Sequence, residues 1–399
     1  MNIRGCHVMA KPSGSVCNLD CEYCFYLEKE KLYPKRQTNW KMSDETLTRF
    51  ILQHIEAQPG LDVEFAWQGG EPTLLGIEFF QRVTDLCEEF KGDKRISHTF
   101  QTNGILINDE WCEFFNKHRF LVGVSIDGPK ELHDFYRVNR SGKGSFDKVM
   151  KAISLLNKHN IEFNTLTVVN DKNAKHPLKT YEFLKSIGSK FIQFIPLVER
   201  KESEEKTSIL SGPNETFTGV TEWSVSPIEY GQFLNDIFDT WLRQDVGSTC
   251  VQTFETTLAS WITGSSNICV FSKTCGHAFA LEANGDLYQC DHYVYPEYKI
   301  GNIHTQRIRS MNASDKAIEF GQQKFTNLNK KCKACPYLSQ CYGGCPKHRF
   351  NISPSGKPDH NYLCEGYFKY FQHTENAMKF MRMLIQAGRP ASHVINYVK

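Results

Sequence analysis

The cysteines of this chain are unevenly placed, and their placement limits what the chain can fold into more than any other feature. Of the fifteen cysteines in 399 residues, three lie within residues 17–24 and eight within residues 269–364. An odd number fits a complete disulfide framework poorly, and disulfides are rare in a reducing compartment. We therefore predict that the clustered cysteines bind metal: Cys17, Cys21, Cys24, Cys269, Cys275, Cys290, Cys332, Cys335, Cys341, Cys345 and Cys364. The isolated cysteines are expected to be small apolar core residues: Cys6, Cys87, Cys112 and Cys250.

Composition argues against two kinds of partner and indicates a compartment. The formal net charge is +2 and no long run of Lys or Arg occurs, so the concentrated basic face of a nucleic-acid-binding protein is missing. No segment approaches the ~18 consecutive apolar residues of a membrane span. The start, MNIRGCHVMAK, lacks the apolar core of a signal peptide. We therefore expect a cytoplasmic protein that binds neither nucleic acid nor membrane.

Residues 5 to about 240 alternate between short apolar segments typical of strands and longer segments with helical spacing of apolar residues. We predict six strands, at Cys6–Ala10, Val63–Trp67, His98–Gln101, Leu121–Ile126, Phe163–Val169 and Phe191–Ile195. Helices are expected from an N-cap at Ser43 and over 78–90, 109–118, 146–159 and 177–187. Such alternation gives a parallel sheet with right-handed crossovers, and six units are fewer than the eight of a closed barrel. The predicted fold is α/β, a partial (β/α)6 barrel resembling an open TIM barrel.

The rest of the chain departs from this alternation. Residues 199–223 are polar and aperiodic, so they are expected to be a surface insertion. The turn-rich segment 269–364 is expected to bury little apolar surface and to be organised by bound metal. A final helix is predicted over 367–386. The expected domains are a barrel over 1–240, a cysteine-rich domain over 241–364 and a C-terminal helix over 365–399.

Cys17, Cys21 and Cys24 form C-x3-C-x2-C in a loop after the first predicted strand. A closed zinc site and an ordinary iron–sulfur cluster each take four protein ligands, whereas three cysteines are close together here. Three thiolates on a four-iron cluster leave one iron open, and an open iron can chelate the amine and carboxylate of a small amino acid. The spacing alone also allows a zinc knuckle completed by His7 or by a distant residue.

Two further motifs follow later strands. Gly69 and Gly70 lie in QGGEP directly after the second strand, and paired glycines expose backbone polar groups to a close ligand. Ser125 begins SIDGP at the end of the fourth strand, and Arg137 follows it, with a fork that suits a carboxylate or ribose oxygens. On pattern alone, the first motif also fits a simple turn and the second a strand-ending turn with a surface Arg.

Taken together, C-x3-C-x-aromatic-C, GGEP and SIDGP resemble the radical S-adenosylmethionine (SAM) superfamily. In that family a reduced four-iron cluster cleaves SAM to methionine and a 5′-deoxyadenosyl radical. Tyr23 occupies the aromatic position of the cysteine motif, and Leu197 matches a position that packs on adenine. The resemblance implies contacts to the cofactor SAM from Tyr23, Gly69, Gly70, Ser125, Arg137 and Leu197.

The C-terminal cysteines contain the run C-x2-C-x5-C-x3-C, from Cys332 to Cys345, with outliers on both sides. Zinc ribbons also use paired C-x2-C, so spacing alone leaves two zinc ions possible. The pattern resembles the SPASM domain, which binds auxiliary four-iron clusters. The resemblance implies three [4Fe-4S] clusters in all. It assigns the first auxiliary cluster to Cys269, Cys275, Cys290 and Cys345, and the second to Cys332, Cys335, Cys341 and Cys364. Full ligation leaves no iron for substrate, so electron transfer is the expected role of both.

Asp291 directly follows Cys290, a few residues after Asn284-Gly285, which is a strong hairpin signal. A carboxylate beside a cluster ligand is well placed to take a proton while the cluster takes an electron. The alternatives are an Asp that only accepts backbone N–H bonds in a loop, and His292 or water as the base.

Nearly the whole chain resembles anaerobic sulfatase-maturating enzymes, which oxidise an active-site Cys or Ser of a sulfatase to formylglycine. The resemblance implies that the radical takes a hydrogen atom from the substrate Cβ and that Asp291 takes the thiol or hydroxyl proton. An auxiliary cluster takes the second electron, and a Cys substrate then needs hydrolysis. The implied partners are an unfolded or nascent sulfatase segment and a one-electron reductant such as flavodoxin or ferredoxin. The sequence leaves the choice between Cys and Ser open.

Two alternative functions remain at this point. One is a SPASM maturase that cross-links a ribosomal peptide. It is less favoured because only 16 residues precede Cys17, too few for a separate peptide-recognition domain. The other is a non-catalytic zinc-binding scaffold, which would contain zinc without iron.

Overall fold

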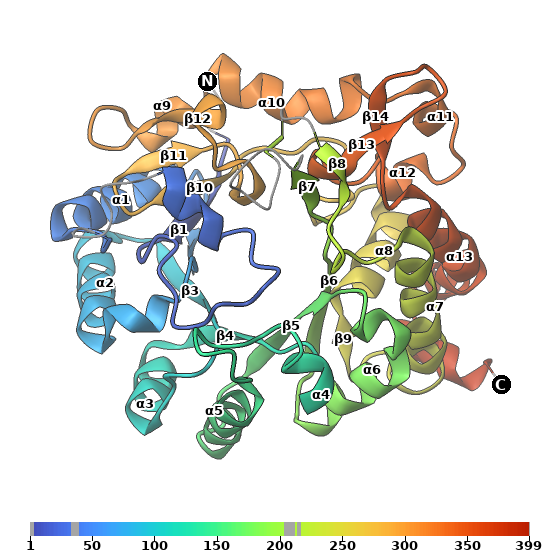
Figure 1. Ribbon diagram of the computed structural model, residues 1–399, viewed down its shortest axis with the longest axis horizontal. Coiled ribbons are helices and arrows are strands. Elements are labelled where there is room, and N and C mark those ends of the chain that lie inside the picture. Colours follow the sequence, from blue (N-terminus) through green and yellow to red (C-terminus); the bar gives the residue numbers. More distant parts are fainter. Residues whose placement is uncertain (1–3, 33–39, 203–211, 214–216, 399) are drawn as a thin grey trace.

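The computed structural model describes residues 4–32, 40–202, 212–213 and 217–398, which form a curved sheet with helices packed outside it (Figure 1). The largest sheet among these residues has ten strands in the order β12-β11-β10-β1-β2-β3-β4-β5-β6-β9. From β1 to β6 all neighbouring strands are parallel, so the chain crosses over between them. The predicted α/β fold with a partial barrel is confirmed.

Each of the six predicted strands and each predicted helix corresponds to an observed element whose bounds differ by a few residues, and further elements were not predicted. The strands are β1 His7–Lys11, β2 Asp62–Trp67, β3 Arg95–Thr102, β4 Phe120–Ser125, β5 Phe163–Val169, β6 Phe191–Pro196, β7 Arg200–Glu202, β8 Phe217–Val220, β9 Cys250–Val251, β10 Ala278–Glu282, β11 Asp286–Tyr288, β12 Lys299–Asn302, β13 Arg349–Ile352 and β14 Pro358–Asn361. The α-helices are α1 Asp44–Ala57, α2 Ile77–Phe90, α3 Asp109–His118, α4 Lys130–His133, α5 Phe146–Lys158, α6 Pro177–Ser186, α7 Pro227–Gln244, α8 Gln252–Thr263, α9 Ile308–Asn312, α10 Asp315–Thr326, α11 Lys330–Lys333, α12 Leu338–Cys341 and α13 Cys364–Gln386.

Helix α1 illustrates why these segments are helical. The Ser43 hydroxyl accepts a hydrogen bond from the N–H of Thr46, and two acidic residues occupy the first turn. Leu47, Phe50 and Ile51 fall on one face and are fully buried. Capping therefore starts the helix, and burial of its apolar face fixes it against the sheet.

The cysteine-rich segment continues the sheet of the barrel. Strand β10 pairs in parallel with β1, from His7 opposite Ala278 to Lys11 opposite Glu282. The chain turns back at Gly285, whose φ of 85° favours glycine, into the antiparallel strand β11. The predicted hairpin is therefore present, but β11 ends before Cys290.

The expectation that this segment buries little apolar surface is wrong. Because β10–β12 extend the barrel sheet, their apolar side chains pack into the same core. The buried apolar residues of the segment include Phe271, Phe279, Leu281, Leu287, Ile303 and Met311.

The insertion over residues 199–223 contains regular structure at both ends. Strands β7 and β8 pair as an antiparallel ribbon, while residues 203–211 and 214–216 lie outside the described residues. The ring of Phe217 packs edge-on against Phe350, with ring centroids 5.2 Å apart. The insertion therefore contacts the cysteine-rich region.

The predicted C-terminal helix is present as α13, which begins at Cys364 and packs along α7. Close approach depends on Gly231 and Gly366, because a Cβ on Gly366 would lie 2.0 Å from the Pro227 carbonyl oxygen. The helix pair thus ties the end of the cysteine-rich region to the barrel.

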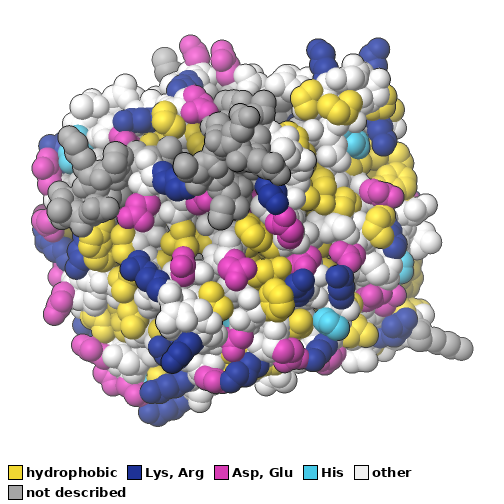
Figure 2. All heavy atoms as spheres, viewed as in Figure 1, with side chains coloured by type: hydrophobic (Ala, Val, Ile, Leu, Met, Phe, Trp, Pro, Cys, Tyr) yellow, Lys and Arg dark blue, Asp and Glu magenta, His cyan; other side chains and the backbone are white. Residues whose placement is uncertain are grey.

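The described surface and helices can be compared with the expectations about nucleic acid and membrane. On the face shown in Figure 2, Lys and Arg are interspersed with Asp and Glu. In the part of the chain that the structure describes, no helix is both long and apolar enough to cross a membrane.

Candidate active site

The three-cysteine loop, residues 17–24, follows β1 and brings its thiols together. Burial raises the pKa of Cys17 to about 12, with further contributions from the Glu71 carboxylate and the Cys24 thiol. Burial also raises the pKa of Cys21, the neighbouring Cys24 and Cys17 add to this, and Arg137 opposes it. The Cys17 Sγ accepts a hydrogen bond from the Leu19 N–H at 3.4 Å. The loop therefore holds three thiols that form one charge-coupled group.

The knuckle completed by His7 does not fit this geometry. His7 begins β1, whereas the loop follows the other end of that strand. Four strand steps separate the ends by about 13 Å at 3.3 Å per residue. The His7 imidazole instead lies 3.6 Å from the Glu64 carboxylate. Among the described residues, no three His, Cys, Asp or Glu side chains converge on a position for a single metal ion.

The backbone of the GGEP segment is hydrogen-bonded to the residues that lead into the three-cysteine loop. The N–H of Gly70 donates to the Gly14 carbonyl at 2.7 Å, and the N–H of Glu71 donates to the Val16 carbonyl at 2.9 Å. A Cβ on Gly70 would lie 2.0 Å from the Val16 oxygen, so only glycine allows this approach. Gly69 has a φ of 142°, which also favours glycine.

The Glu71 carboxylate holds this region from within. It is fully buried and accepts hydrogen bonds from the Thr73 hydroxyl at 2.6 Å, the Thr102 hydroxyl at 2.7 Å and the Asn103 N–H at 2.7 Å. Burial raises its pKa above the ordinary value although these bonds oppose the shift. The Asn103 amide also donates to the Cys17 Sγ at 3.6 Å. Strand β3 is thereby connected to the cysteine loop.

Asp127 of SIDGP is an interior hub that the sequence analysis did not single out. Its carboxylate receives the Arg137 fork at 2.8 and 3.2 Å and the Tyr23 hydroxyl at 2.5 Å. It also accepts the Val168 N–H at 2.9 Å. Its position inside the SIDGP motif, ten residues before Arg137, could have indicated that Asp127 pairs with this arginine. Ser125, the last residue of β4, is buried nearby in sequence and pairs with Leu166 of β5.

Tyr23 and Leu197 belong to one small apolar cluster beside the cysteine loop. Tyr23, Tyr136 and Leu197 are buried together, with Cys21 and Trp223 packed against them. The guanidinium of Arg137 lies 5.5 Å from the Tyr23 ring centroid. The structure therefore brings Tyr23, Arg137 and Leu197 to the side of Cys21.

The C-terminal cysteines form two separate groups. In the first four-cysteine group, burial raises the pKa of Cys275 to about 11, and its neighbours Cys345 and Cys269 contribute. Burial raises the pKa of Cys290 well above its ordinary value, again with Cys345 and Cys269 contributing. This group therefore consists of Cys269, Cys275, Cys290 and Cys345, although β10–β12 and α9–α12 separate its members in sequence.

The second four-cysteine group shares the neighbouring Arg349 with the first, because this guanidinium interacts with cysteines of both. Burial raises the pKa of Cys341 to about 12, with Cys364 and Cys332 contributing. Burial raises the pKa of Cys364 to about 11, with Cys332 and Cys335 contributing. The group is thus Cys332, Cys335, Cys341 and Cys364. The chemistry of the donor sets, three thiols and twice four, suits one four-iron cluster with an open iron and two that are fully ligated.

Two cations near these groups, the buried Lys324 and the half-buried Arg349, were missed by the sequence analysis. The Lys324 ammonium donates to the carbonyls of Cys269 at 2.5 Å and Val270 at 2.9 Å. Arg349 donates to the carbonyls of Gly343 at 3.0 Å and Tyr342 at 2.7 Å. Both hold cysteine-bearing loops by their backbone, a role that no spacing in the sequence reveals.

Asp291 lies between Cys290 of the first four-cysteine group and the end of β1, the strand that precedes the three-cysteine loop. Its carboxylate forms an ion pair with the ammonium of Lys11, the last residue of β1. Burial alone raises the pKa of Asp291, but Lys11, with a smaller contribution from Lys347, outweighs it and lowers the pKa below the ordinary value. This carboxyl is therefore ionised at neutral pH. Burial and Lys347 lower the pKa of His292 to about 3, so the imidazole is neutral.

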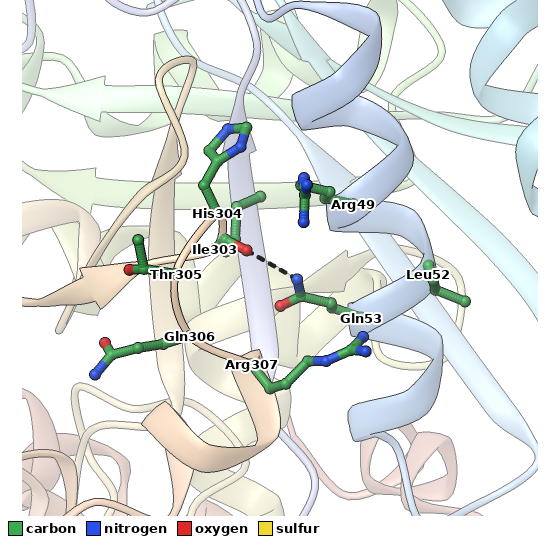
Figure 3. A pocket seen from close by; sticks show the side chains of 8 residues that line it. All are labelled: Arg49, Leu52, Gln53, Ile303, His304, Thr305, Gln306 and Arg307. Atoms are coloured by element: carbon green, nitrogen blue, oxygen red, sulfur yellow. Dashed lines mark hydrogen bonds between the residues drawn. The ribbon is translucent and has the colours of Figure 1, made fainter.

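Two cavities can be compared with the positions of these residues. One of about 530 Å³ lies beside Cys17 and is lined by Val16, Cys17, Asn18, Trp40, Leu74, Asn139, Arg140 and Ser141. The other, about 240 Å³, lies between α1 and residues 303–307 (Figure 3). Its lining includes no predicted ligand, and the Gln53 amide crosses it to the Ile303 carbonyl at 2.9 Å. The first cavity is therefore the one that adjoins the cysteines.

Comparison with known proteins agrees with this arrangement. The model of the radical SAM superfamily matches residues 12–184, which contain the cysteine loop, GGEP and SIDGP. The model of an iron–sulfur cluster-binding domain, SPASM, matches residues 269–336. The fold and the site thus define a radical SAM enzyme with a SPASM domain.

Relatives narrow the class to one family. A serine-type anaerobic sulfatase-maturating enzyme of Bacteroides thetaiotaomicron is 45% identical over 98% of this chain and 95% of its own length. A cysteine-type enzyme of Clostridium novyi is 33% identical over 92% of this chain and 94% of its own. The solved structure of anSMEcpe with bound AdoMet and Cp18Cys peptide superposes with a TM-score of 0.83 at 31% identity, covering 95% of this chain and 99% of that one. The chain belongs to the anaerobic sulfatase-maturating enzymes, which removes the zinc scaffold and the peptide cross-linking maturase as alternatives.

Proposed function

We propose that this chain oxidises an active-site Cys or Ser of a sulfatase to formylglycine, on a peptide segment held in the barrel. One observation carries the proposal: an ionised carboxylate, Asp291, follows Cys290 of the first four-cysteine group and pairs with Lys11 at the base of the three-cysteine loop. The higher identity to a serine-type relative favours a seryl substrate.

The eleven clustered thiols suit three [4Fe-4S] clusters. When bound, these clusters and SAM would supply the 5′-deoxyadenosyl radical that takes a hydrogen atom from the substrate Cβ, and an acceptor for the second electron. The proposed ligands are the three cysteines of residues 17–24 and the two four-cysteine groups. The raised pKa values of their buried thiols mean that metal binding must release protons.

The chain's own part in the reaction is proton transfer and positioning. Asp291 would accept the thiol or hydroxyl proton of the substrate, because it is ionised and lies next to a proposed cluster ligand. Loss of one hydrogen atom, one proton and one electron completes a two-electron oxidation. A Ser substrate then gives the aldehyde directly, whereas a Cys substrate gives a thioaldehyde that takes up water and releases hydrogen sulfide.

The proposed SAM contacts surround the side of Cys21. Arg137 uses its Nε–H and one Nη2–H towards Asp127, which leaves donors for a carboxylate or ribose oxygens. Leu197 and Tyr23 offer apolar surface to adenine. Ser125, Gly69 and Gly70 complete the proposed set at the ends of β4 and β2.

The remaining proposals concern partners and setting. A one-electron reductant such as flavodoxin or ferredoxin would reduce the cluster of the three-cysteine loop. A cytoplasmic location suits so many thiolate ligands, because they require a reducing compartment. The domain limits at residues 240 and 364 also remain proposals, since β10–β12 join the barrel sheet.

The test is anaerobic incubation of reconstituted, reduced enzyme and SAM with matched peptides carrying either Ser or Cys at the sulfatase position. We expect formylglycine in at least one peptide, identified by mass and by trapping of the aldehyde, together with 5′-deoxyadenosine. A peptide with Ala at that position is the control and should remain unchanged. An unaltered mass in both reactive peptides, despite 5′-deoxyadenosine formation, would contradict the proposal.

The role of Asp291 is tested separately. Asp291→Asn keeps the shape and removes the charge, so iron content and SAM binding should persist while aldehyde falls about a hundredfold or more. His292→Gln serves as a comparison for the neutral neighbour. Aldehyde formation within a few-fold of the unaltered enzyme in Asp291→Asn would exclude this base.

A further inference from the structure

Lys11, the last residue of β1, is a lysine that is buried beside Asp291. Its side chain is 2% exposed, and its ammonium pairs with the Asp291 Oδ1. The Lys11 carbonyl accepts the Gly14 N–H at 2.9 Å, so the same residue starts the turn that leads into the three-cysteine loop. Lys11 therefore joins the loop of Cys17 to the residue after Cys290.

The ammonium is held from a second side. It lies 4.4 Å from the centroid of the Tyr26 ring, and the Tyr26 hydroxyl donates to the Glu282 carboxylate. Glu282 is the register partner of Lys11 across the parallel pair of β1 and β10. Lys29 and Lys347 are the other ammonium groups whose charge acts on Asp291, and the adjacent His292 imidazole is neutral. The position of the Lys11 ammonium is thus fixed by the sheet and by an aromatic face.

The two oxygens of Asp291 are not equivalent in this arrangement. Oδ1 is buried against Lys11, which is its only partner among the described residues, whereas the Asp291 side chain as a whole is 19% exposed. A buried ion pair adds little net stability compared with apolar side chains of similar volume. The buried side of the Asp291 carboxylate needs a cationic partner, but stability alone does not determine which of its two oxygens that partner contacts.

We propose that Lys11 is a positioning residue that orients the Asp291 carboxylate, holding Oδ1 so that Oδ2 points to the substrate proton. This inference rests on the proposed role of Asp291 as base. The end of β1 then has two functions: it leads into the cysteine loop, and it orients the Asp291 carboxylate. Because the base must lie within hydrogen-bond reach of the proton, a shift of about 1 Å can cost up to a hundredfold in rate.

The test is a double-mutant cycle with Lys11→Met, Asp291→Asn and the double variant, measured with the Ser and Cys peptides. Iron content, SAM affinity, 5′-deoxyadenosine and aldehyde are determined for each. We expect Lys11→Met to keep iron and SAM binding but to make about tenfold to a hundredfold less aldehyde per 5′-deoxyadenosine. In the Asp291→Asn background the same change should have no further effect, because its target is already lost.

Two further variants separate positioning from general damage. Lys11→Arg keeps the charge and should restore much of the coupling. Lys185→Met removes an ammonium that pairs with Asp245 at 2.9 Å on the outside of the barrel, and it should leave the coupling unchanged. If Lys11→Met does not fold, Lys11→Gln takes its place in the cycle.

The outcomes distinguish the inference from the proposed function. Wild-type coupling in Lys11→Met beside an inactive Asp291→Asn overturns the inference alone. Wild-type coupling in Asp291→Asn overturns the base and the inference with it. Independent, multiplicative losses in the double variant also refute the inference, because Lys11 would then act other than through Asp291.

Discussion

Replacing Asp127 by Asn removes the charge at the hub between SIDGP and the cysteine loop while keeping the side chain's shape. Its carboxylate is 1% exposed and binds the Arg137 fork, the Tyr23 hydroxyl and the Val168 N–H. Oδ2 accepts the Tyr23 hydroxyl and the Arg137 Nε–H, and Oδ1 accepts the Arg137 Nη2–H and the Val168 N–H. An amide replaces one of these oxygens by an NH2 donor, so two of the four hydrogen bonds are lost. The variant leaves the guanidinium of Arg137 without its buried partner.

The expected loss of stability follows from the burial of Asp127. Breaking a buried ion pair by removing one partner costs about 3–5 kcal/mol of unfolding free energy. Tyr23 and Arg137, the proposed SAM contacts, also lose their common anchor. Loss of one hydrogen bond to a charged group is worth about 1.5–3 kcal/mol, so SAM should bind about tenfold to a hundredfold more weakly.

The assay measures chemical unfolding of the anaerobic protein and SAM binding at equilibrium. Asp245→Asn is a matched control, because Asp245 accepts from Lys185 at 2.9 Å and from Tyr181 at 2.8 Å away from the cysteine loop. It should lower stability without lowering the SAM affinity of the folded fraction. Unchanged SAM affinity in folded Asp127→Asn would refute the argument that this hub positions Tyr23 and Arg137.

Four further predictions follow from the same structure. Reconstituted protein should contain about twelve iron atoms, and changing all three cysteines of residues 17–24 to Ala should remove a third of the iron and all SAM cleavage; retained cleavage would exclude this loop as the site. Cys332→Ala should still bind SAM but yield little aldehyde, and full peptide oxidation despite loss of that iron would contradict an electron-transfer role. Gly70→Ala should lose the iron of the three-cysteine loop while keeping the other iron, because its Cβ would lie 2.0 Å from a carbonyl oxygen of that loop; unchanged iron would disprove the close contact. Burial lowers the pKa of His98 to about 3, whereas in the unfolded chain the imidazole takes up a proton near pH ~6.5. As the pH is lowered from ~6.5 towards 3, the unfolding free energy should therefore fall by up to ~1.4 kcal/mol per pH unit. Urea titrations of His98→Phe should show a weaker pH dependence, and an unchanged pH dependence would exclude His98 as its source.

Local patterns in the sequence predicted most of the elements. The helix from Ser43 has its predicted cap, and the strands at 163–169 and 191–195 appear almost as predicted. Such features depend on neighbours within a few residues, since apolar periodicity and capping act locally. The cysteine motifs were equally visible, because chelation needs thiols on short, adjacent segments.

Other features depend on which distant segments meet, and a single sequence does not specify that. Residues 278–302 were expected to form a separate region, but β10 adds to β1 and extends the barrel sheet. Residues 199–223 were expected to be a surface insertion without apolar periodicity, and the pairing of its ends as β7 and β8 was not predicted. Strand pairing is decided by packing across the whole core, so composition of the segment alone cannot reveal it.

The sequence by itself determined the class of chemistry: three thiols in one loop, eight in another region, and a carboxylate next to one of them. Only the tertiary structure decided how that carboxylate is held. Lys11 and Asp291 are 280 residues apart, and neither has a local pattern that points to the other. They meet because β1 and β10 are neighbours in the sheet, and a buried charge is stable only beside a partner that the fold brings to it.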